Sequence, residues 1–166
     1  MIYDEESVIA DLVGLLQSDL NAEINLINTE KGAVSGDPLF LSEIPNDKYI
    51  FESLNKTILN YKGFFIMYGL KENPPREQQE VNMIEDVTVT VEISTFDSGT
   101  KNMNNLFTKL LRYRRALKSL VMKNPEMFRS YAKPFVQSLK PAAFPYSKNV
   151  VILSIGLDIR ASISTF

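Results

Sequence analysis

Two stretches of this chain alternate apolar and polar residues one by one, the pattern of a half-buried β-strand. In the first, Val87 to Ser94, valine and isoleucine occupy the odd-numbered positions. In the second, Asn149 to Ile163, apolar residues again occupy the odd-numbered positions from Val151 onward. Both are predicted to be long strands that cover the core with their odd-numbered face. The other face is expected to meet water or a wet interface through Thr88, Thr90, Glu92, Asp158 and Arg160.

Two further stretches repeat apolar residues at the three- and four-residue spacing of an amphipathic helix. The first is predicted from Glu5 to Leu20, with Asp4 placed to cap its first turn. The second is predicted from Met103 to Lys123 and ends where Asn124-Pro125 disfavours further helix. Each helix has one apolar face that must pack against another element.

Shorter apolar segments predict three more strands. Gly63 to Leu70 is apolar on both faces, so it is expected at the centre of a sheet or at an interface. Ile24 to Asn28 is short and β-branched and is predicted to be a strand, and Phe135 to Leu139 an edge strand. Tyr49 to Leu54 is too short to decide between a strand and a helical turn.

Glycine and proline separate these elements. They predict a loop from Gly32 to Pro38 and a long exposed loop from Lys71 to Glu80, between two antiparallel strands. A chain of 166 residues fits one domain, 1–166. The predicted fold class is therefore α+β, with an antiparallel or mixed β-sheet and two main helices packed on one of its faces.

Composition excludes most familiar catalytic centres. The chain has no cysteine and no histidine, so thiolate nucleophiles, zinc-thiolate sites and imidazole bases are impossible. Glu85 and Asp86 are adjacent, but neighbouring residues of a strand point to opposite faces, which disfavours a metal site. We expect no enzyme activity, no catalytic residue, no metal and no cofactor. Without a signal sequence or membrane-spanning run, we expect a soluble protein made in the cytoplasm.

Charge is strongly segregated along the chain. Residues 1–30 carry seven acidic side chains and no basic one. Residues 72–97 carry seven acidic side chains and a single arginine, whereas 98–124 carry seven basic side chains and no acidic one. Such blocks usually indicate contact, either within a chain or between chains.

The basic helix leaves three alternatives open. At about 100° per residue, Lys109, Arg112 and Arg115 spread around its non-core side rather than forming one stripe. A solvated face paired with the acidic segments, a protein interface and a nucleic-acid interface are all possible, in that order of preference. Arg114 lies inside the apolar stripe, where a charge must either reach water or find an ion pair, for example with Asp11 or Asp19.

The order of elements resembles that of the tail terminator, or tail completion, proteins of tailed bacteriophages. These elements are an acidic first helix, a hairpin with the long Lys71–Glu80 loop, a long strand, the basic helix and a closing strand. The resemblance covers most of the chain and lies in length, element order and style. It implies a small α/β structural protein that forms a sixfold ring, caps the tail tube, stops its polymerisation and joins the tail to the neck.

The resemblance also implies partners and a location. The expected partners are further copies of the chain, the tail tube, the neck or connector proteins, and DNA that passes through the lumen without sequence-specific binding. The expected location is the tail-neck junction of the virion, with no membrane contact. Acidic loop residues are expected to face the lumen or the tube. The candidate contact residues are Arg76, Glu77, Glu80, Lys109, Arg112, Arg114, Arg115 and Lys118. The alternative is a nucleic-acid-binding or regulatory accessory protein that uses the basic helix 101–123.

Overall fold

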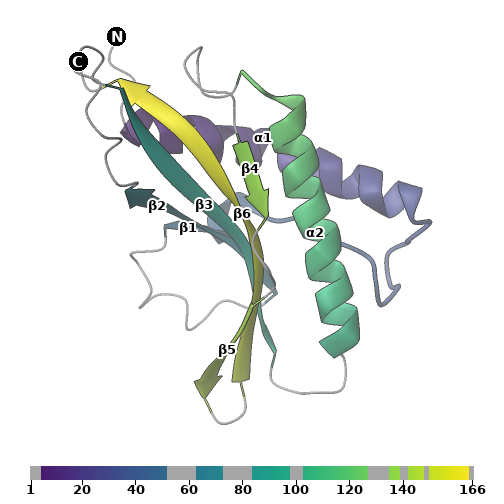
Figure 1. The fold of residues 1–166 in the computed structure, drawn as a ribbon. Coiled ribbons are helices and arrows are strands. Elements are labelled where there is room, and N and C mark those ends of the chain that lie inside the picture. The colour runs from purple at the N-terminus through teal and green to yellow at the C-terminus, as the bar shows by residue number, and fades with distance from the viewer. Residues whose placement is uncertain are drawn as a thin grey trace.

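The two long alternating stretches form the paired strands β3 (Ile84–Asp97) and β6 (Val150–Ser164). They run antiparallel in continuous register, from the pair Ile84–Ser164 to the pair Asp97–Val151. The computed structural model describes residues 5–51, 63–72, 84–97, 103–126, 135–138, 142–147 and 150–164. In Figure 1 the β3–β6 pair is the long curved ribbon around which the other elements are arranged.

Six described strands form one mixed sheet in which β1, β2, β3, β6 and β4 follow in that order, and β5 also pairs with β6. The β1–β2 pair is parallel and every other pair is antiparallel. The remaining elements, in chain order, are α1 (Glu5–Glu30), η1 (Asn46–Lys48), β1 (Tyr49–Phe51), β2 (Phe64–Glu72), α2 (Met103–Lys123), β4 (Phe135–Ser138) and β5 (Ala142–Ser147). The α+β fold class with two main helices on one sheet face is confirmed.

The core lies between the helices and the inner face of the sheet. Val91 and Ile93 of β3 and Ile159 of β6 are buried there, as the alternating pattern predicted. They pack in one cluster with residues of α1 and α2, among which Tyr113 is the largest fully buried side chain. Its ring also lies 4.6 Å from that of Phe64.

The predicted strand at Ile24–Asn28 is wrong, because these residues are the last turns of α1. Ile24 and Ile27 continue the buried stripe of that helix past Leu20. Burial on the helical stripe outweighs the weak strand preference of β-branched side chains. The first helix therefore extends ten residues beyond its predicted end, to Glu30.

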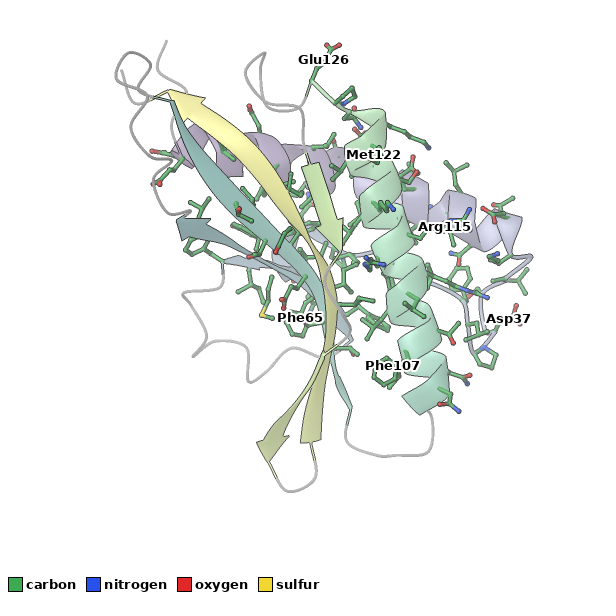
Figure 2. All side chains as sticks on the ribbon, viewed as in Figure 1. Asp37, Phe65, Phe107, Arg115, Met122 and Glu126 are labelled. Carbon is green, nitrogen blue, oxygen red and sulfur yellow. The ribbon has the colours of Figure 1, made fainter. Side chains whose placement is uncertain are left out.

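The outer face of the sheet is less open than predicted. Thr88, Glu92 and Asp158 are partly exposed, but Thr90 and Ser94 are buried. Ser94 lies directly opposite Phe65 of β2, which with Ile50 and Met67 forms a second, smaller apolar cluster on this face. Figure 2 shows Phe65 and Phe107 on opposite sides of the β3–β6 ribbon. The apolar outer face of β2 therefore covers part of the polar face of β3.

The edges of the sheet combine predicted and unpredicted strands. β4 is the edge strand expected at Phe135–Leu139, and β1 settles the undecided segment as a strand at Tyr49–Phe51. β5 was not predicted, because Pro145 reads as a strand breaker. The register with β6 shifts between Pro145 and Ser147, an irregularity that accommodates the proline at an edge. The predicted Lys71–Glu80 loop lies almost wholly outside the described residues.

Candidate functional site

The candidate contact residues that the structure describes all lie on α2, and its core stripe determines their directions. Leu110, Tyr113, Leu117 and Leu120 are buried against α1 and the sheet. The charged residues must therefore occupy the flanks and the outer side of the helix. Three of the candidate contact residues belong to the predicted long loop and lie outside the described residues, namely Arg76, Glu77 and Glu80.

Arg115 forms a two-pronged ion pair with Glu30, the last residue of α1. Its two terminal nitrogens donate to the two carboxylate oxygens over 2.9 and 2.7 Å. The hydrogen bonds from Arg115, together with its charge, hold the pKa of Glu30 below its ordinary value. Both side chains are about half exposed, so solvent screens the pair. Arg115 therefore links the two helices and retains an exposed edge.

Lys123 forms the second link between the helices, to Glu23. Its ammonium nitrogen lies 2.5 Å from a Glu23 carboxylate oxygen, and the carboxylate side chain is 11% exposed. Burial acts to raise the pKa of Glu23, but hydrogen bonds from Lys123 and Ser119 and the charge of Lys123 outweigh it, and the net pKa is lowered. The acidic first block and the basic block thus make contact within the chain, which was the preferred of the three alternatives.

We expect acid to weaken the Glu23–Lys123 link. A carboxyl whose pKa is lowered by folding stabilises the fold when the pH is well above its ordinary pKa of 4.5. This stabilisation is lost as the pH falls through the folded-state pKa. Urea unfolding at pH 7 and pH 3 should therefore show a smaller loss of stability in Glu23→Gln than in the parent. An equal loss in both proteins would contradict this assignment.

Arg112 and Tyr113 hold a segment that we call the strap, residues 39–44, which lies against both helices. The Arg112 guanidinium donates to the backbone oxygen of Leu39 over 2.8 Å, and the Tyr113 hydroxyl donates to that of Ser42 over 2.7 Å. Burial raises the pKa of Tyr113, so its hydroxyl keeps the proton that it donates. Arg112 is therefore committed to its own chain, as is Arg115.

Two asparagines of α1 hold the other side of the strap. Asn28 donates to the oxygen of Leu41 and accepts from its nitrogen, both over 2.9 Å. Asn21, two turns earlier, makes the same two-way pairing with Ile44, over 3.1 and 2.8 Å. Each side-chain amide thus satisfies one backbone nitrogen and one backbone oxygen of the strap, as a neighbouring strand would do in a sheet. These hydrogen bonds to the strap were not predicted from the sequence, although it shows two asparagines seven residues apart beside the core stripe of α1.

Three candidate cations remain. Arg114 is half-buried rather than enclosed, which fits a side chain that runs from the core stripe toward the surface. Lys109 is partly buried as well, and burial lowers its pKa. Lys118 is exposed, and it forms no ion pair or hydrogen bond with any part of the chain that the structure describes.

Exposed large apolar side chains gather on the helical layer. Among the described residues they are Leu26 of α1, Val34 of the following loop, and Leu111 and Met122 of α2, each at least 50% exposed. Figure 2 shows Arg115 on the side of α2 away from the strands. Apolar and cationic groups thus share the outer surface of this helix.

The described residues provide no group of three or more acidic side chains that could hold a metal ion. Neither described helix is long and apolar enough to cross a membrane. The helical layer consists of two helices linked by ion pairs, and its outer surface carries exposed cations and exposed apolar side chains. No protein-family model and no curated protein sequence matches the chain.

Proposed function

We propose that this chain is a structural virion protein that forms a hexameric ring at the end of a phage tail tube. The ring caps the tube, stops its polymerisation and joins the tail to the neck. The protein has no catalytic activity and no cofactor in this role. Its partners are copies of itself, the tail tube and the neck proteins, and DNA passes through the ring without sequence-specific binding.

The observation that supports this proposal is the order and pairing of the elements. A long acidic helix comes first, the β2–β3 hairpin follows, then the basic helix α2, and β6 returns to lie antiparallel beside β3. This is the element order on which the resemblance to tail terminator proteins rests. The described residues contain these helices and strands in this order, and the Lys71–Glu80 loop of the resemblance lies almost wholly outside them.

The nucleic-acid alternative loses support from the contacts of α2. Arg115 is paired with Glu30, and Arg112 donates to the backbone of the strap. Lys109 is partly buried. Among Lys109, Arg112, Arg115 and Lys118 of this helix, Lys118 alone is both exposed and without a partner among the described residues. Non-specific DNA binding depends on several cations that can neutralise phosphates together.

The mass and outline of the purified protein in solution test the proposal. We expect a particle about six times the 18.8 kDa chain by native mass spectrometry, with a ring seen in negative-stain images. A dilution series separates a weak ring, which dissociates, from a stable one. A strict monomer at every concentration, with no ring in any image, would contradict the proposal.

A further inference from the structure

We draw no further inference here: the strongest candidate, the exposed apolar side chains Leu26, Leu111 and Met122 of the helical layer formed by α1 and α2, carries none because nothing in the structure shows what covers them.

Discussion

Replacing Asn28 with leucine is expected to lower the free energy of unfolding by about 2–6 kcal/mol, since each buried backbone group left without a partner costs roughly 1–3 kcal/mol. Asn28 is buried, and its amide satisfies both the nitrogen and the oxygen of Leu41. Leucine has a similar volume but can neither donate nor accept a hydrogen bond. Leu41 itself is fully buried, so water cannot replace the lost bonds unless the strap detaches.

The measurement is urea unfolding followed by circular dichroism, with Asn25→Leu as the matched control. Asn25 lies on the same helix and allows the same substitution, but it is exposed. Its amide donates a hydrogen bond to the exposed Glu43 side chain over 2.8 Å. Its replacement should change stability by no more than about 0.5 kcal/mol, the range of ordinary surface substitutions. Equal unfolding midpoints for the two variants would show that the strap is not held as described.

The long periodic elements could be predicted from sequence because their side chains carry a redundant signal. The alternating pattern runs from Val87 to Ser94 in β3 and from Val151 to Ile163 in β6. The start of α2 at Met103 and its end at Lys123 are marked by turn residues and by Asn124-Pro125. One misplaced residue does not obscure such a pattern. The fold class therefore followed from four segments alone.

The features that sequence did not predict depend on contacts between distant residues. Ile24–Asn28 has a strand-like composition, and only packing of Ile24 and Ile27 in the core makes it helical. β5 exists because β6 is long enough to pair with a proline-containing segment. The hydrogen bonds between Asn28 and Leu41 join residues thirteen positions apart, through a side chain at the end of the segment that was predicted to be a strand.

The candidate site was predicted in part. The charge blocks indicated contact, and the Arg115–Glu30 and Lys123–Glu23 pairs provide it within the chain, although no pattern could say which acid pairs with which cation. Arg112 donates to the backbone of the strap and Arg115 is paired with Glu30, whereas Lys118 is exposed. Contact with other subunits or with the tail tube therefore remains a proposal for α2.

Deletion of the gene for this chain from the tailed phage that we propose encodes it should abolish nearly all infectious particles. A tail tube without its cap has no signal to stop growing, and a tail without the joining ring cannot attach to a head. A plasmid-borne copy of the parent chain should restore infectivity, which controls for effects of the deletion on neighbouring genes. If a plasmid-borne Asn25→Leu variant restores infectivity and an Asn28→Leu variant does not, the loss of infectivity depends on the fold of this chain.

Tail-tube length in electron micrographs of the deletion lysate then decides between a tube-capping protein and any other role. We predict tubes longer than those of the parent phage, together with heads that carry no tail, and a return to the parent length on complementation. Tubes of the parent length joined to heads in the absence of this chain would contradict the proposal that it caps the tail.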